Sequence, residues 1–233
     1  MDTNNIINAT PVLSDNSENA VLAGSFKWMA LGLFISGLVS VFVAATPALV
    51  DLILGSSFGF IILAIAELAL VWYLSARIMS LSKETARALF IVYAALNGLT
   101  LSVIFLAYQL SSIINIFFST AIMFALLALY GARTKKDLSS LGRLAYFGLI
   151  GLIIALVINI FIGNSGLDLA LSFLGVIIFT ILTAYDVQKI KALARSLGAS
   201  DPSRVVVLGA LKLYLDFINL FLSLLRIFGR RKS

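Results

Sequence analysis

Seven long apolar segments follow one another along the chain, separated by short polar connections. They cover residues 26–50, 58–76, 88–108, 113–132, 144–162, 167–185 and 205–228. A helix needs about 20 apolar residues to cross the hydrocarbon core of a bilayer, whereas the strands of membrane barrels have about 10 residues that alternate in polarity. The pattern therefore predicts an all-α integral membrane protein whose neighbouring helices run antiparallel in one bundle.

Lysine and arginine gather in every second connection, around residues 77–87, 133–143 and 189–204. The connections between these, around residues 47–55, 109–112 and 163–168, contain neither residue. Because basic connections stay in the cytoplasm, we expect the chain to begin there. Residues 1–24, which include several asparagines and no basic residue, are expected to form a disordered polar cytoplasmic tail. Residues 25–229 are predicted to be a single transmembrane helical domain, and residues 230–233 a basic tail.

The seventh segment differs from the others because Lys212, Asp216 and Asn219 interrupt it. A charge at the centre of a span costs about 2.5–3.5 kcal/mol, and the basic residues that follow Arg226 favour a cytoplasmic C-terminus. A re-entrant hairpin of two half-helices in the bundle centre satisfies both constraints, since broken backbone is tolerated inside protein. We therefore predict six spans around a re-entrant C-terminal segment. The alternative is a full seventh span with its C-terminus outside.

Composition excludes several kinds of chemistry. Of the 233 residues, 61% are hydrophobic and 12% charged, against about 45–50% and about 25% in soluble domains. The absence of cysteine excludes disulfides and thiolate metal sites, and the absence of histidine excludes a Ser–His–Asp triad. No spacing of a nucleophile and a base stands out. We therefore expect neither an enzyme nor a bound cofactor, and a lipid bilayer rather than nucleic acid as the partner.

Four ionisable residues at membrane depth are candidate functional residues: Glu67, Arg77, Asp186 and Asp216. Each has a structural alternative. Asp186 could pair with Lys189 if its helix continues, and Asp216 with Lys212 four residues earlier. Arg77 could be an interfacial arginine that reaches the headgroups, and Glu67 a protonated acid bonded to a neighbouring helix.

The two aspartates suggest a specific chemistry. Helical spacing places Lys212, Asp216 and Asn219 on one polar face of the seventh segment, where Lys212 and Asn219 are possible modulators of Asp216. Two carboxylates held close together share one proton and can respond to pH without a histidine. When ionised, Asp186 and Asp216 would provide hard oxygen ligands for calcium.

Three sequence blocks carry a resemblance to a known family. They are NGLTLS at 97–102, TAYDVQKI at 183–190 and LYLDFINLF at 213–221, the last continuing as LSLLRIFG at 222–229. The segment TKKDL at 134–138 also contributes to the resemblance. In these blocks the chain resembles the transmembrane Bax inhibitor motif (Bax inhibitor-1) family, especially its bacterial members. The resemblance covers about residues 26–229.

The resemblance implies six helices around a central C-terminal helix and a pH-sensitive calcium leak. Asp186 and Asp216 are similar to the family's paired aspartates, which sense pH at the cytoplasmic mouth of the pore. Arg77 resembles the arginine that pairs with an aspartate in the closed state, and Glu67 resembles the acidic residue of the same helix. Calcium enters this scheme as the transported ion.

Three functions remain open at this stage. The leading one is a passive, pH-gated cation leak with calcium and protons as its partners. The second is a proton-coupled transporter, because carboxylates inside membranes also relay protons. The third is a regulatory membrane protein of stress or cell death that acts through protein partners. The expected location is a bacterial inner membrane, with the endoplasmic reticulum as the alternative.

Overall fold

The computed structural model describes residues 15–55, 57–197 and 202–232, and these residues fold almost entirely into helices. The helices are α1 (Asp15–Ala44), α2 (Pro47–Leu54), α3 (Ser57–Arg77), α4 (Lys83–Ala107), α5 (Leu110–Arg133), α6 (Ser139–Ile162), α7 (Ser165–Leu197) and α8 (Pro202–Phe228). All except the short α2 are long and apolar enough to cross a membrane. This confirms the predicted all-α membrane fold.

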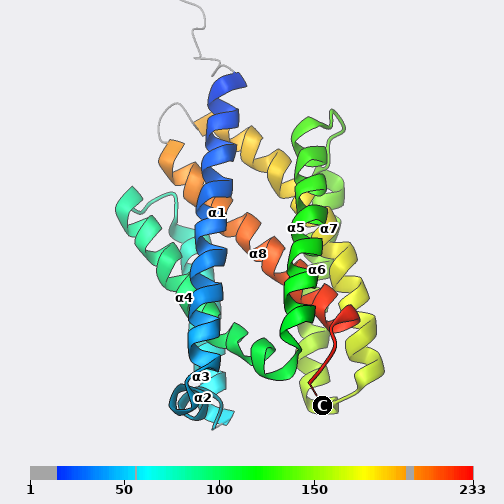
Figure 1. Cartoon of the computed structure of the whole chain (residues 1–233). Coiled ribbons are helices and arrows are strands. Elements are labelled where there is room, and N and C mark those ends of the chain that lie inside the picture. Colours follow the sequence, from blue (N-terminus) through cyan, green and yellow to red (C-terminus); the bar gives the residue numbers. More distant parts are fainter. Residues whose placement is uncertain (1–14, 56, 198–201, 233) are drawn as a thin grey trace, which may run out of the picture.

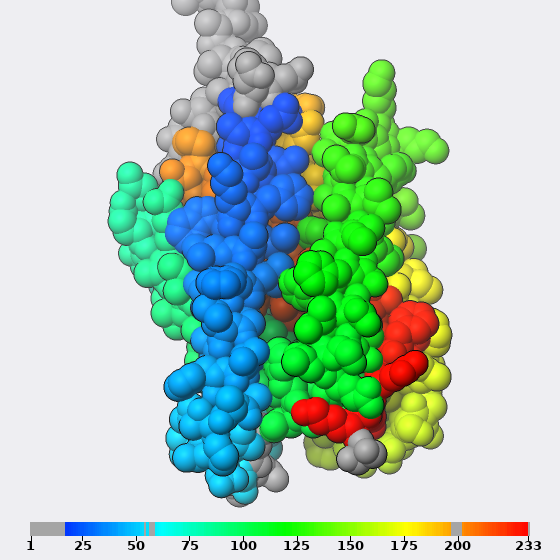
Figure 2. All heavy atoms as spheres, in the orientation of Figure 1, coloured from blue at the N-terminus to red at the C-terminus, as the bar shows by residue number. Residues whose placement is uncertain are grey.

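Helix α8 lies at the centre of the bundle (Figure 1). It packs against α1, α4, α5 and α7, while α3 packs on α4 and α6 packs on α7. On the face shown in Figure 2, α1 and α5 cover most of α8, and its last turns reach the surface beside α5. Of the residues in the most apolar stretch of α8, 67% are buried, against at most 44% in the corresponding stretch of any other span. The predicted central position of the C-terminal helix is therefore confirmed.

The predicted re-entrant hairpin is wrong, because α8 is one continuous helix from Pro202 to Phe228. Its polar residues have partners inside the bundle and do not need a break in the backbone. Lys212 pairs with Asp186 of α7, and the Asn219 side chain donates to the carbonyl of Leu215 at 2.8 Å. The charges that disfavour a span facing lipid are compatible with a span surrounded by protein.

We call the end of the bundle that holds the connections 78–82 and 134–138 the basic end. The C-terminal residues lie at the opposite end (Figure 1). The Gln109 amide donates to the Arg230 carbonyl, and the Lys232 amide donates to the Ala107 carbonyl, each at 2.9 Å. The Lys232 ammonium also donates to the carbonyl of Phe105. The expected return of the C-terminus to the basic end is thus wrong, since its cations are bound locally by the α4–α5 connection.

The N-terminal boundary also differs from the prediction. Helix α1 begins at Asp15, so residues 15–24 of the predicted disordered tail are helical. Glu18 in this stretch is buried and forms an ion pair with Arg195 of α7. The rest of the predicted tail, residues 1–14, lies outside the described residues.

Small residues allow the helices to approach closely, as is common inside membranes. A Cβ atom on Gly131 of α5 would lie 2.2 Å from the carbonyl oxygen of Ala184 in α7. Between α1 and α4, Ser36 donates to the carbonyl of Ala94 at 2.7 Å, and Ser40 donates to that of Gly98 at 2.8 Å. These contacts bring backbones together without leaving buried hydroxyl groups unpaired.

The position of the C-terminus can be tested with single cysteines, because the chain contains none. We expect Lys232→Cys to react with a membrane-impermeant maleimide added outside the cell, because the basic end faces the cytoplasm. Lys83→Cys at the start of α4 is the control and should react only after permeabilisation. Labelling of Lys232→Cys only after permeabilisation would contradict this topology.

The contact between α5 and α7 predicts a large effect of Gly131→Leu. The added side chain meets the Ala184 carbonyl, and overpacking of this kind costs about 1–3 kcal/mol. Gly151→Leu on α6 is the matched control, because a Cβ atom there has no neighbour within 4 Å. Unfolding of the purified variants in mixed detergent micelles measures the difference, and equal stability of the two would refute the close packing.

Candidate functional site

Two of the predicted site residues, Asp186 and Asp216, lie inside the bundle on neighbouring helices. Helix α7 continues to Leu197, so Asp186 lies within the helix and not at its end. Asp186 and Asp216 are both buried, with 2% and 4% of their surfaces exposed. The packing of α7 against α8 therefore brings these two sequence blocks together.

Asp186 forms a compact cluster with residues of α6 and α8. The Lys212 ammonium donates to Oδ1 of Asp186 at 2.9 Å and to the hydroxyl oxygen of Tyr146 at 2.7 Å. The Tyr146 hydroxyl donates in turn to both carboxylate oxygens of Asp186, at 3.2 Å each. The ammonium also lies 5.3 Å from the centre of the Tyr146 ring. One carboxylate, one ammonium and one phenol thus join three helices.

This arrangement differs from both alternatives considered for the aspartates. Lys212 pairs with Asp186 on α7 and not with Asp216 on its own helix. Lys189, the other expected partner of Asp186, donates to the Tyr185 hydroxyl at 3.0 Å. Since a buried charge is tolerated only when it is paired and hydrogen-bonded, the Asp186–Lys212 pair accounts for the two charges it contains.

Asp216 is the unpaired member of the site. It follows Lys212 by four residues in α8, and its Oδ2 atom is buried without a hydrogen-bond partner among the described residues. It lies close enough to Asp186 and Lys212 to interact electrostatically with both. When all three groups are ionised, two carboxylates share one ammonium, and a proton on Asp216 removes the excess negative charge.

A polar stripe continues from this site along α8 toward the opposite end of the bundle. Asn219, Ser223 and Arg226 follow Asp216 on the same helical face. Together with seven apolar residues of α6, α7 and α8 they line a cavity of about 60 Å³. Ser223 donates to the carbonyl of Asn219 at 2.8 Å. Asn219 therefore lies in the stripe, and its side chain donates to the backbone of its own helix.

Glu67 belongs to a separate polar cluster between α3, α4 and α8. It accepts hydrogen bonds from Thr100 at 2.7 Å and from Asn97 at 3.5 Å. The Asn97 amide oxygen accepts from the Tyr214 hydroxyl at 2.8 Å, which also bonds to Ser36 of α1 at 2.7 Å. Tyr214 precedes Asp216 by two residues, so α8 contacts both polar clusters.

Arg77 is not part of either cluster. It is the last residue of α3 and its side chain is exposed. Because α3 packs on α2 and α4 and makes no extensive contact with α7 or α8, the described residues contain no ion pair between Arg77 and an aspartate. The cation paired with Asp186 is Lys212 of α8, whereas the resemblance implied that Arg77 pairs with an aspartate.

Tyr146 is the residue of the site that the sequence did not reveal. It lies near the start of α6, where tyrosine is common at membrane interfaces for reasons unrelated to a site. The only feature of the sequence that could have drawn attention to Tyr146 is that it follows the basic connection 134–138. The described residues contain no group of three or more carboxylate, imidazole or thiol side chains able to hold a metal. The Lys212 ammonium occupies Oδ1 of Asp186, one of the two predicted calcium ligands.

Six spans around a central seventh span, α8, with a buried charged cluster define an integral membrane protein with an ionisable site inside its bundle. The chain belongs to the Bax inhibitor-1 family, since the family model "Inhibitor of apoptosis-promoting Bax1" matches residues 18–233. The three resembling blocks supply Asn97 of the Glu67 cluster, Asp186, and the pair Tyr214 and Asp216.

Several bacterial proteins are similar to the chain over almost its whole length. "Inner membrane protein YbhL" of Escherichia coli (strain K12) is 44% identical over 214 residues, which are 91% of this chain and 92% of that protein. An uncharacterized protein of Borreliella burgdorferi is 41% identical over 218 residues, covering 93% and 94% of the two chains. With the seven spans, these relatives confirm the expected bacterial inner-membrane location.

The Asp186–Lys212 pair predicts a strong effect of Lys212→Met on stability. Removing the ammonium leaves Asp186 as an uncompensated charge, and breaking a buried pair costs about 3–5 kcal/mol. The double variant Lys212→Met/Asp186→Asn should recover much of this loss, because the remaining buried charge is gone. Unfolding of the single and double variants in mixed micelles measures the coupling.

Lys83→Met is the control for that experiment, since Lys83 is exposed at the start of α4. It should change the free energy of unfolding by less than about 0.5 kcal/mol. Additive effects of the Lys212 and Asp186 substitutions would show that the two side chains are not coupled.

Proposed function

We propose that the protein is a passive, pH-sensitive cation leak channel that conducts calcium and is gated by Asp186, Lys212 and Asp216. The observation that carries this proposal is the buried Oδ2 of Asp216, which lacks a hydrogen-bond partner among the described residues. It lies next to an ion pair that joins α7 to the central helix. Ionisable residues inside a membrane bundle typically belong to ion or proton pathways.

The gate would work through competition for the Lys212 ammonium. With a proton on Asp216, Lys212 serves Asp186 alone and holds α7 against α8. With Asp216 ionised, two carboxylates attract the same ammonium, because residues four apart on a helix are neighbours. Protonation of Asp216 thus changes the strength of the contact between α7 and α8. A local change of charge would then switch the bundle between a closed and an open state.

The polar stripe of α8 would supply the path beyond the gate. The cavity beside Asn219 and Ser223 measures about 60 Å³, and a water molecule needs about 10–15 Å³ of such space. The carboxylate, amide and hydroxyl oxygens along this face are the ligand types that calcium prefers. The intrahelical bonds of Asn219 and Ser223 and the occupied Asp186 agree with a closed state.

The proposal assigns no catalytic step and no bound cofactor to the chain. A proton-coupled transporter is the second candidate, supported by the same buried carboxyl. The two differ in energetics: a transporter uses an imposed pH gradient to accumulate calcium against its own gradient, whereas a leak only dissipates that gradient. A regulator that acts only through partner proteins would show neither behaviour.

Calcium flux into liposomes that contain the purified protein tests the proposal. We expect wild-type flux to differ between about pH 6 and about pH 8, because two neighbouring carboxylates share a proton. Asp216→Asn should abolish this dependence and hold the flux near its acidic value, since an amide mimics the protonated carboxyl. Asp186→Asn should also alter the profile, because it releases Lys212 from α7.

Asp51→Asn is the matched control, since Asp51 is an exposed carboxylate on α2, and it should retain the wild-type pH profile. Flux no greater than that of empty liposomes at any pH would refute the leak. Uphill accumulation of calcium under an imposed pH gradient would favour the transporter.

A further inference from the structure

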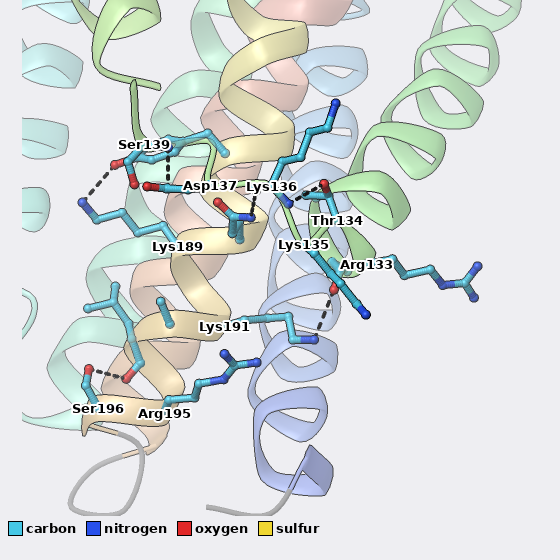
Figure 3. A pocket seen from close by; sticks show the side chains of 16 residues that line it. Arg133, Thr134, Lys135, Lys136, Asp137, Ser139, Lys189, Lys191, Arg195 and Ser196 are labelled. Atoms are coloured by element: carbon cyan, nitrogen blue, oxygen red, sulfur yellow. Dashed lines mark hydrogen bonds between the residues drawn. The ribbon is translucent and has the colours of Figure 1, made fainter. Parts of the chain in front are cut away.

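A broad cleft opens at the basic end of the bundle, away from the buried charged site. It has a volume of about 810 Å³ and lies between the end of α5, the connection 134–138 and the last turns of α7 (Figure 3). Hydroxyl groups of Thr134, Ser139 and Ser196 are among its lining groups. The cleft is concave and polar, unlike the apolar outer surface of the spans.

Cations dominate the lining of this cleft. Six basic side chains contribute to it, namely Arg133, Lys135, Lys136, Lys189, Lys191 and Arg195. Asp137 is the single carboxylate among the lining residues. Hydrogen bonds from the side chain and the backbone amide of Ser139 lower the pKa of Asp137 from its ordinary value, so Asp137 is charged at neutral pH. Arg195 is paired with Glu18 of α1, so the single negative charge of Asp137 opposes the five other positive charges of the lining.

The walls of the cleft are held in place by hydrogen bonds between the connection and α7. The side chain of Gln188 accepts from the Leu138 amide at 2.9 Å and donates to the Lys136 carbonyl at 2.8 Å. The Lys191 ammonium donates to the carbonyl of Ala132 at 3.2 Å. These bonds fix the basic connection against the helix, so the cations do not need to be gathered when a ligand arrives.

Several of these cations have unused hydrogen-bonding capacity. The side chains of Arg133, Lys135 and Lys136 form no hydrogen bond or ion pair with another described residue. Lys191 uses one donor on a backbone carbonyl, and an ammonium carries three. Figure 3 shows Lys135 and Lys191 extending to the same side of α7 from different elements. A concentration of like charges in a preformed cleft is stabilised by a multiply charged anion.

We infer that this cleft binds a phosphate-bearing anion. Phosphate oxygens accept several charge-assisted hydrogen bonds at once, which matches the Lys135 and Lys191 ammonium groups that extend to the same side of α7 from different elements (Figure 3). The phosphate can belong to an acidic lipid headgroup or to a soluble compound. The lipid source is favoured by position, because Leu129 and Tyr130, just before Arg133, are exposed on the outer face of α5. The site therefore lies at headgroup depth.

Binding to the full-length protein in detergent tests this inference, with one arm for each source of phosphate. Native mass spectrometry measures retention of phosphatidylglycerol against phosphatidylcholine, and calorimetry measures inorganic pyrophosphate. Both use about 150 mM salt, where the Debye length is about 8 Å and distant charges are screened. Preferred retention of phosphatidylglycerol identifies the lipid source, and binding of pyrophosphate identifies the soluble source.

The variant Lys135→Gln/Lys136→Gln should weaken binding of the responding probe by about tenfold or more, as expected when charge-assisted hydrogen bonds are lost. Lys27→Gln/Lys83→Gln removes the same charge from exposed positions at the same end and should bind as the wild type does. Equal weakening by both double variants, or no binding of either probe, would overturn the inference and leave a solvated basic face. Because no ion flux is measured, this result is independent of the proposed channel.

Discussion

The structure depends on a buried ion pair, because a charge in the low-dielectric interior of the bundle must be neutralised by a partner. Asp186 and Lys212 meet at 2.9 Å, and Tyr146 bonds to both of them. Because a charge inside a bundle is tolerated only with a partner, this contact fixes the register of α7 against α8 and brings α6 to the same level. It also explains how α8 can cross the bundle without a break although it carries a lysine and an aspartate.

The same constraint divides the polar residues of the core into satisfied and unsatisfied groups. Glu67 is bonded to α4, and through Asn97 and Tyr214 its cluster reaches both α8 and α1. Asp216 alone among the candidate acids has a buried oxygen without a partner among the described residues. Networks whose polar groups are all hydrogen-bonded make a core rigid. A carboxyl without a partner affects the neighbouring salt bridge differently when it is protonated and when it is ionised. The central helix therefore combines a rigid frame with one responsive position.

Much of this fold could be predicted from the sequence, and the failures have physical causes. Seven apolar runs predicted the spans, and the resembling blocks predicted that Asp186 and Asp216 belong together. The re-entrant segment was wrong because the cost of a charge in a span was applied to Lys212 as if it faced lipid, whereas Lys212 is paired with Asp186. The charge rule failed at the C-terminus because backbone and ring contacts hold Lys232 and Arg231 at the other end. Tyr146 could not be found, because its role exists only through contacts with α7 and α8.

Because the C-terminal residues are attached to the α4–α5 connection, a small tilt of α8 would move its distant residues most. Backbone hydrogen bonds from Gln109 and Lys232 fix the chain just after Phe228. A tilt of the helix would therefore pivot about this end. From Gly229 to Lys212 is about 25 Å of helix at 1.5 Å per residue, so a tilt of about 5° displaces Lys212 by about 2 Å. That movement would break a 2.9 Å contact with Asp186 while hardly disturbing the pinned end.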